Sequence, residues 1–318
     1  IASLQRAIDI FPQIDDVRIP IEQVYHALAE VFEVNGDLKM AIEYLEKFAE
    51  SVEEVVEKGD TVRRIGKIWE KVGDRNIALA TYEQASALLK GHPESVEMGR
   101  VLMNQSWILN RQRASDLAFA KCNQALNLFE RNQATEDIAE ANNNLAVFYE
   151  QIGDLDLALS HNEKSLELFQ KTNNKAKIGN LHMSLGYVHN KCKSFTDALQ
   201  NFEKAFAIAE TIGNRLGSAT SLMAKGRCYL DLDEYDKSEI VLRQSLKIFK
   251  RANIGFRIVA NHLSLAKVYL NKDNTQMASE CMREARAIAL ETNSVADLGK
   301  INRMDGHILI KEGNDPRE

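Results

Sequence analysis

Two histidines near the middle of the chain, His182 and His189, have a spacing that could serve metal binding. Residues seven apart lie on one face of an α-helix, so two imidazoles at this spacing could bind the same ion. However, His189 falls at a position where tyrosine or phenylalanine stands in similar segments of the chain, and no carboxylate ligand is suggested nearby. We therefore interpret both histidines as packing residues and predict no metal site.

The four cysteines lie at least 36 residues apart and form no C-x-x-C pair. Structural zinc sites and disulfide frameworks require closer grouping or a small secreted scaffold. We therefore predict buried free thiols in a reducing compartment, which indicates a cytoplasmic protein. The cysteines are Cys122, Cys192, Cys228 and Cys281.

The sequence contains no G-x-G-x-x-G, G-x-x-x-x-G-K-[ST], H-E-x-x-H or G-x-S-x-G motif. Aspartate and glutamate are frequent, but on amphipathic helices most such residues form the solvated face. The sequence therefore predicts no cofactor and no enzymatic activity.

The composition of the 318-residue chain favours helix throughout. Hydrophobic residues make up 45% and charged residues 27%, with only four prolines and sixteen glycines. Straight-chain residues lose little freedom in a helix, and no alternating β-branched run predicts a strand. The net charge of −6 argues against nucleic acid as a partner, since phosphate binding requires converging lysines and arginines. No apolar run reaches the roughly 18–20 residues of a membrane helix, so we expect no membrane insertion.

A small residue recurs along the chain with a spacing of 37 residues at first and 40 residues afterwards. A second series begins at Ala41 and a third at Phe48, and both keep the same spacing. Three interleaved series in one register predict a structural repeat. The first series comprises Ala29, Gly66, Ser106, Ala146, Gly186, Gly226, Ala266 and Gly306.

Each cycle of this pattern predicts a helical hairpin. The first helix carries the small residue and a large one three positions later, which share a face. A Gly-Asp turn follows in several cycles, where glycine ends the first helix and aspartate caps the second. Cycle three lacks this turn, at residues 111–115. Each hairpin has an apolar side that only a neighbour can cover, so the hairpins should stack.

The pattern Leu-Gly-x-x-Tyr, then Gly-Asp, then Ala-x-x-x-Phe-x-x-Ala resembles the tetratricopeptide repeat (TPR) family over nearly all of residues 22–312. The resemblance implies an all-α fold, an α-solenoid of stacked antiparallel helix hairpins known as the TPR superhelix. Most cycles exceed the usual ~34 residues of the family, with the extra length after the second helix. This longer form is similar to arrays in Pins-type polarity adaptors, bacterial peptide receptors and the sensor regions of signalling ATPases.

We expect a single TPR array over residues 1–318. Residues 1–20 should form the second helix of a preceding repeat and residues 299–318 a partial repeat, which indicates a fragment of a longer protein. The expected full repeats are residues 22–58, 59–98, 99–138, 139–178, 179–218, 219–258 and 259–298.

The resemblance also implies that the first helices line a concave groove. The side chains that would face this groove are rich in Arg, Lys and Asn, although the whole chain is acidic. Amides can pair with an extended peptide backbone and cations with its carboxylates, so we predict an acidic protein or peptide partner. The predicted peptide-binding residues are Arg63, Arg64, Lys67, Arg100, Asn104, Trp107, Arg111, Asn143, Asn144, Tyr187, Asn190 and Arg227.

Two features of this predicted groove have a second interpretation. The cations could pair with carboxylates of the chain and contribute only solubility. Trp107 could be a binding anchor, or it could fill a packing gap beside the irregular turn of cycle three. The carboxylates available for pairing are Glu30, Glu33, Asp60 and Glu70.

The pattern as a whole favours a non-catalytic scaffold that binds a protein or peptide. An alternative is the sensor or regulatory region of a larger signalling enzyme (an ATPase, cyclase or kinase), which would bind a small ligand or its own flanking domain. A third hypothesis is end-to-end self-association through the uncovered apolar ends of the array.

Overall fold

The computed structural model describes residues 20–313, so the helix expected at residues 1–20 lies outside the described residues apart from Pro20. Within that range the chain forms fifteen α-helices and one short 3-10 helix, with no strand. The all-α prediction is therefore confirmed. The contacts divide the chain into two compact units, an N-terminal unit that ends at Ile152 and a C-terminal unit that begins at Gly153.

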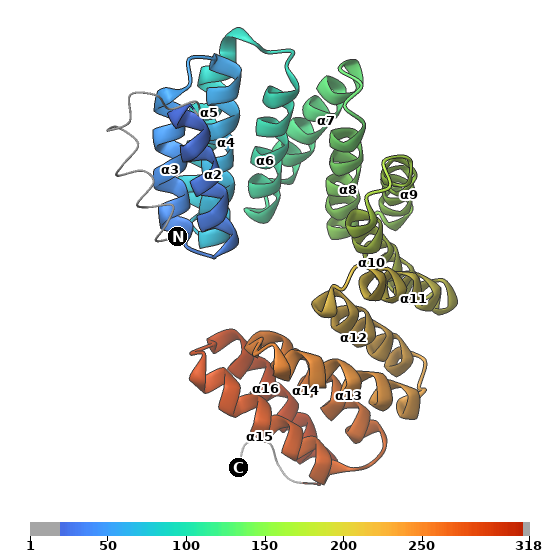
Figure 1. Ribbon diagram of the computed structural model, residues 1–318. Helices are drawn as coiled ribbons and strands as arrows, with labels where there is room; N and C mark the ends of the chain where they lie inside the picture. Colours follow the sequence, from blue (N-terminus) through green and yellow to red (C-terminus); the bar gives the residue numbers. More distant parts are fainter. Residues whose placement is uncertain (1–19, 314–318) are drawn as a thin grey trace. The chain divides into compact units, whose positions relative to one another are not determined.

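The N-terminal unit consists of helical hairpins in which successive helices run antiparallel (Figure 1). The second helix of each hairpin also packs against the first helix of the next one. The first helices are α2 (Ile21–Val34), α4 (Val55–Val72), α6 (Val96–Arg111) and α8 (Thr135–Ile152). The second helices are α3 (Leu38–Ser51), α5 (Arg75–Leu88) and α7 (Ser115–Arg131), and the 3-10 helix η2 (Leu89–Gly91) extends α5.

The C-terminal unit is more regular, because every one of its described helices has 17 residues. It begins with α9 (Leu155–Lys171) and ends with α16 (Val295–Lys311), which is followed by no further described helix. Between them lie the hairpins α10 (Lys175–Lys191) with α11 (Phe195–Thr211), α12 (Arg215–Asp231) with α13 (Tyr235–Arg251), and α14 (Gly255–Asn271) with α15 (Thr275–Glu291).

The small residues of the first series lie where two helices approach closely. A methyl group added at Gly66 of α4 would lie 2.6 Å from the ring of Tyr82 on α5. At Gly186 of α10, the added group would lie 2.5 Å from the ring of Phe202 on α11. Both rings are almost fully buried. In these two hairpins the small residue therefore makes room for an aromatic ring of the second helix.

The connections between helices have a common geometry that the sequence analysis found only in part. Gly36, Gly73 and Gly153 adopt positive φ, and the aspartate after each of them caps the next helix, as predicted. Gly213 and Gly313 also adopt positive φ, but at most other connections the same left-handed position holds a residue with a side chain. In cycle three, which lacks Gly-Asp, Arg113 has a φ of 64°. The other such residues are Gln133, Asn173, Lys193, Asp233, Asn253, Asp273 and Asn293.

The helix boundaries differ from the expected repeat boundaries by a few residues. In the C-terminal unit each first helix begins four residues before the expected repeat start, for example at Lys175 rather than at residue 179. The difference arises because the small residue lies about three turns inside the first helix, for example Gly186 in a helix that begins at Lys175. None of the helices in the described range has the length and hydropathy of a membrane span.

Candidate functional site

Two of the predicted binding residues on α4, Arg63 and Arg64, already contact side chains of the same unit. The Nε of Arg63 donates to Asp60 over 2.7 Å, one turn earlier on the same helix. Arg64 lies 2.5 Å from Nε2 of His26 and 3.9 Å from Glu30, both on α2. The two arginines therefore stabilise α4 and its contact with α2.

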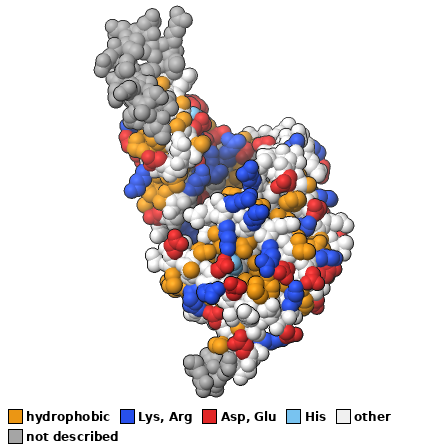
Figure 2. Space-filling view, turned by 60° about the horizontal axis from the view of Figure 1, so that its bottom comes forward, with side chains coloured by type: hydrophobic (Ala, Val, Ile, Leu, Met, Phe, Trp, Pro, Cys, Tyr) orange, Lys and Arg blue, Asp and Glu red, His pale blue; other side chains and the backbone are white. Residues whose placement is uncertain are grey.

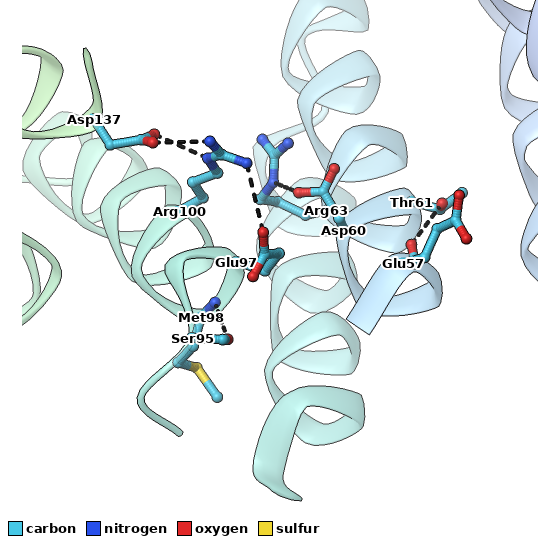
Figure 3. A network of polar contacts seen from close by, with 9 residues as sticks. All are labelled: Glu57, Asp60, Thr61, Arg63, Ser95, Glu97, Met98, Arg100 and Asp137. Carbon is cyan, nitrogen blue, oxygen red and sulfur yellow. Dashed lines mark hydrogen bonds and ion pairs between the residues drawn. The ribbon is translucent and has the colours of Figure 1, made fainter. Parts of the chain in front are cut away.

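Arg100 of α6 makes the most extensive ion pair of the predicted set (Figure 3). Its Nε and one terminal nitrogen donate to the two carboxylate oxygens of Asp137 on α8, over 2.9 and 2.8 Å. A third nitrogen lies 3.7 Å from Glu97. The hydrogen bonds to Asp137 raise the pKa of Arg100 above its ordinary value. This bidentate pair ties two first helices together.

These contacts match the second interpretation of the cations, since three of the four expected carboxylates are engaged. Asp60 and Glu30 pair with the arginines of α4, and Glu33 of α2 pairs with Lys71. The fourth carboxylate, Glu70, instead accepts a hydrogen bond from the hydroxyl of Tyr82. Much of the positive charge on these first helices is therefore neutralised within the unit.

Lys67 and Arg111 differ from these arginines, because both side chains are exposed. They lie near Glu70, between α4 and α6. Burial holds the pKa of the Glu70 carboxyl above its ordinary value, and the positive charges of Lys67 and Arg111 oppose this shift in part. Asn104 lies next to Tyr82 in the same region, and its Nδ2 is buried without a hydrogen-bond partner among the described residues.

Trp107 of α6 is half-buried and has contacts of two kinds. One is packing, because its ring stacks on Phe148 of α8 with 6.4 Å between the centroids. The other is with Arg111, whose guanidinium carbon lies 5.9 Å from the centre of the Trp107 ring. The tryptophan thus fills space between α6 and α8, as one interpretation expected, and also supports an exposed cation.

Asn143 and Asn144 of α8 are both half-buried. Within the described range of the chain, neither side chain has a hydrogen-bond partner. An amide carries two donor hydrogens and an acceptor oxygen, so both remain available to another molecule.

The other three predicted residues lie in the C-terminal unit. Tyr187 of α10 is 36% exposed and packs edge-on against Phe202. Asn190 donates from Nδ2 to Asp231 of α12 over 3.0 Å, and Arg227 of α12 donates from Nε to Ser264 of α14 over 3.1 Å. These contacts connect successive first helices of this unit, as Arg100 does in the N-terminal unit.

The histidines and cysteines take mainly structural positions. His182 is buried, its Nδ1 lies 2.9 Å from Oδ1 of Asn201, and burial lowers its pKa. In the described part of the chain, no three His, Cys, Asp or Glu residues are grouped as a metal site. Cys122 is buried, which raises its pKa to about 12, and Cys228 and Cys281 are buried as well. Cys192, however, is exposed, so the prediction of burial was wrong for this residue.

The sequence analysis missed an acidic cavity of about 720 Å³ in the N-terminal unit. Four glutamates line it, from the start of α2, from the segment that joins α3 to α4 and from the first turn of α4, and Phe48 lines it as well. The run of glutamates after α3 was the available signal, but it was treated as a solvated surface. The glutamates are Glu22, Glu53, Glu54 and Glu57.

Charged side chains of both signs are mixed on the surface. Figure 2 shows one face on which small groups of lysine and arginine lie between acidic and hydrophobic side chains. A cationic surface can therefore be identified only where cations lack carboxylate partners. The contacts of each cation show this, whereas the composition of the chain does not.

Comparisons with known proteins agree with this repeat. Models of the tetratricopeptide repeat match residues 22–51, 139–172 and 177–251. No curated protein matches the chain.

Several solved structures share the fold at low sequence identity. The apo form of RapI is 16% identical, with 91% of this chain and 82% of that chain covered and a TM-score of 0.71. A Rap protein complexed with competence and sporulation factor is 16% identical, with coverages of 92% and 82% and a TM-score of 0.69.

A signal-transduction ATPase with a tetratricopeptide repeat sensor, from Pyrococcus horikoshii, is 15% identical with a TM-score of 0.71. The alignment covers 99% of this chain and 47% of that one, so the chain spans about half of that protein. Residues 22–51, 139–172 and 177–251 are therefore tetratricopeptide repeats, within an array of similar helical hairpins.

Proposed function

We propose that the protein is a non-catalytic scaffold that binds an acidic, extended protein segment on the first helices of its N-terminal unit. The observation that carries this proposal is the stack of Trp107 with the exposed cation Arg111, together with the unpartnered amides of Asn143 and Asn144 on α8, which come about one turn before the Phe148 that Trp107 packs on. A rigid aromatic anchor, a cation and open amides are together the groups that bind an extended peptide with carboxylate side chains.

The contacts divide the predicted residues of this unit into two roles. Arg63, Arg64 and Arg100 already pair with other side chains, so we assign them to holding the first helices in position. Lys67 and Arg111 are exposed, and we assign them to binding the carboxylates of the partner. Tyr187, Asn190 and Arg227 form a separate candidate surface on the C-terminal unit.

The arrangement of the first helices also supports this function. Side chains from α4, α6 and α8 come from successive repeats, so one extended segment could contact all three helices. The structure of the Rap protein complexed with competence and sporulation factor gives an example of this fold in a complex. No catalytic motif in the sequence competes with this interpretation.

The test uses the tryptophan itself as a reporter. The chain has two tryptophans, and replacing Trp69 by phenylalanine leaves Trp107 as the single emitter. The probe is a peptide of alternating glutamate and proline, which stays extended. We expect its addition to change Trp107 fluorescence. The change Lys67→Gln with Arg111→Gln should weaken binding by about ten-fold, since each exposed pair contributes up to about 1 kcal/mol.

A matched control loses the same charge elsewhere in the unit. Lys39 and Arg75 are exposed and have no ion-pair partner among the described residues, so Lys39→Gln with Arg75→Gln should bind the peptide as the unchanged protein does. A glutamine-proline peptide of the same length should not bind. The proposal is wrong if the acidic peptide leaves the fluorescence unchanged or binds both variants equally well.

A second candidate function is the sensor region of a larger signalling protein. It is favoured by the match to the archaeal ATPase, in which this whole chain corresponds to about half of that protein. In this case a small ligand or a flanking domain would replace the peptide. The Trp107 reporter separates the two, because a sensor of this kind would leave the fluorescence unchanged with the acidic peptide.

A further inference from the structure

The exposed side of α13, a second helix of the C-terminal unit, is basic although the whole chain carries a net charge of −6. Arg243, Lys247, Lys250 and Arg251 line a shallow depression of about 350 Å³, and Leu246 lines it as well. No other residue of the range 20–313 lines it. We call these five residues the α13 surface.

Two of the four cations are held by neighbouring carboxylates. The Nε of Arg243 donates to Glu239 over 2.9 Å, one turn earlier on the same helix. Lys250 donates to Glu284 of α15 over 2.5 Å. These contacts fix the two side chains in place, so the sides of the depression are preorganised before any ligand binds.

The other two cations, Lys247 and Arg251, are exposed, and neither has an ion-pair partner in the part of the chain that the structure describes. A cation without a partner can bind an anion and break no contact within the protein. These two residues therefore have the largest capacity to bind an external carboxylate or phosphate.

The spacing of the cations indicates the shape of the ligand. From Arg243 to Arg251 the helix rises about 12 Å, at about 1.5 Å per residue, and the cations recur at intervals of about one turn. One phosphate could not contact cations spread over this length. Carboxylates on every fourth residue of a partner helix have the same spacing. Ile240, which is 57% exposed, continues the row by one turn and offers an apolar contact.

The surroundings favour a narrow partner over a membrane. Acidic side chains lie beside the cations, with Glu239 one turn before Arg243 on α13 and Glu284 of α15 against Lys250. A flat anionic membrane would bring these carboxylates near its own charges, which costs free energy. A single helix that follows α13 contacts the cations without meeting the same repulsion.

We propose that the α13 surface is a docking site for an acidic helical segment of another protein, with its glutamates or aspartates spaced one turn apart. This site is separate from the one proposed near Trp107, because it lies on a second helix of the C-terminal unit, whereas the site near Trp107 lies on first helices of the N-terminal unit. A partner that binds here therefore need not be the segment that binds near Trp107.

The experiment uses the full chain and a fluorescein-labelled helical peptide of alanine with glutamate at every fourth position. Binding is followed by fluorescence anisotropy at low salt. We expect Lys247→Glu with Arg251→Glu to weaken binding by at least about ten-fold, because two attractive pairs become repulsive. Both side chains are exposed, so circular dichroism should show an unchanged helix content.

The matched control is Lys175→Glu with Lys193→Glu, two exposed cations of the same unit with no ion-pair partner in the described range. This variant should keep the affinity. If Lys67→Gln with Arg111→Gln loses the helical peptide while Lys247→Glu with Arg251→Glu keeps it, the α13 proposal is wrong and the N-terminal site is the one that binds it.

Other ligands give decisive outcomes. No binding of the helical peptide by the unchanged protein contradicts the proposal, and so does equal binding by the Lys247/Arg251 variant. Binding of a phosphoserine peptide or of phosphatidylserine vesicles that requires Lys247 and Arg251 also overturns the proposal, if binding of the glutamate helix does not require these two residues. A glutamine version of the helix should bind weakly in every case.

Discussion

The two compact units are built from the same helical hairpin, yet their helices end differently. In the N-terminal unit α3 and α5 have 14 residues each, and the left-handed turns are occupied by glycine at 36 and 73 but by Arg113 and Gln133 further on. In the C-terminal unit every described helix has 17 residues, and most of the left-handed positions hold a residue with a side chain. The comparison shows that a 40-residue period requires neither glycine in the turn nor a second helix of 17 residues, because the 40-residue step from Gly66 to Ser106 contains the 14-residue helix α5.

Packing inside the hairpins, by contrast, follows one rule in both units. Gly66 faces Tyr82 in the N-terminal unit, and Gly186 faces Phe202 in the C-terminal unit, with little room for a side chain in either case. Gly306 of α16, which is followed by no further described helix, has no atom within 4 Å of an added methyl group. The close contact at the small residue is thus made by the second helix of the same hairpin, α5 for Gly66 and α11 for Gly186.

Overpacking these two glycines should have the largest effect. We expect Gly66→Val and Gly186→Val each to lower the free energy of unfolding by about 1–3 kcal/mol, because an aromatic ring must move from a well-packed position. Urea unfolding followed by circular dichroism measures the change. Gly306→Ala is the control and should raise stability by up to about 1 kcal/mol through helix propensity. Unequal losses at Gly66 and Gly186 would show that the two units do not share this packing rule.

The sequence was informative about these packing positions because a small residue at a close approach leaves a direct signal in the repeat. The turns were predicted only where they contain glycine, since glycine is the usual signal of positive φ, and Arg113 or Lys193 gives none. The groove cations were identified by type, and their partners Asp60 and Glu30 were among the expected carboxylates, but the partner of Arg100, Asp137, was not. Arg100 and Asp137 are 37 residues apart and meet only because neighbouring repeats stack.

The α13 surface was missed for a related reason. The family resemblance directs attention to first helices, whereas Lys247 and Arg251 lie on a second helix. Whether a surface cation is available depends on which carboxylates lie beside it. That is a property of the folded chain, and the sequence alone does not reveal it.

The units also differ in buried groups that titrate. Repeat-equivalent positions, 40 residues apart, hold Asn142 in the N-terminal unit and His182, Leu222 and His262 in the C-terminal unit. His262 is only 3% exposed, with Glu284 at 3.3 Å and Lys250 next to that carboxylate. Burial lowers the pKa of His262 to about 4, against an ordinary value of 6.5.

This burial predicts a loss of stability in acid. Between about pH 6.5 and pH 4 the unfolded chain binds a proton at His262 that the folded protein excludes, so the free energy of unfolding should fall as the pH falls. From pH 7 to pH 5 we expect a loss on the order of 1 kcal/mol from this residue. His262→Leu, which copies Leu222, should reduce the loss, and urea unfolding at the two pH values measures it. Identical pH profiles for the two proteins would contradict this account of His262.

The smallest expected effects concern the turns. A residue with a side chain in the left-handed region carries a backbone strain of about 1 kcal/mol, which glycine avoids, although glycine also loses more conformational entropy on folding. We therefore expect Lys193→Gly, at a φ of 61°, to raise the free energy of unfolding by about 0.5 kcal/mol. Gly36→Ala and Gly213→Ala should lower it by about 1 kcal/mol each.

Lys193→Ala separates the backbone from the side chain, because it removes the lysine but keeps the strained conformation. If Lys193→Ala stabilises the protein as much as Lys193→Gly does, the gain comes from removing a surface cation and not from relief at positive φ. If neither change has an effect while Gly213→Ala destabilises, the regular connectors of the C-terminal unit tolerate side chains without strain. The two kinds of helix end would then be energetically equivalent, and the difference between the units would lie only in the length of the second helices.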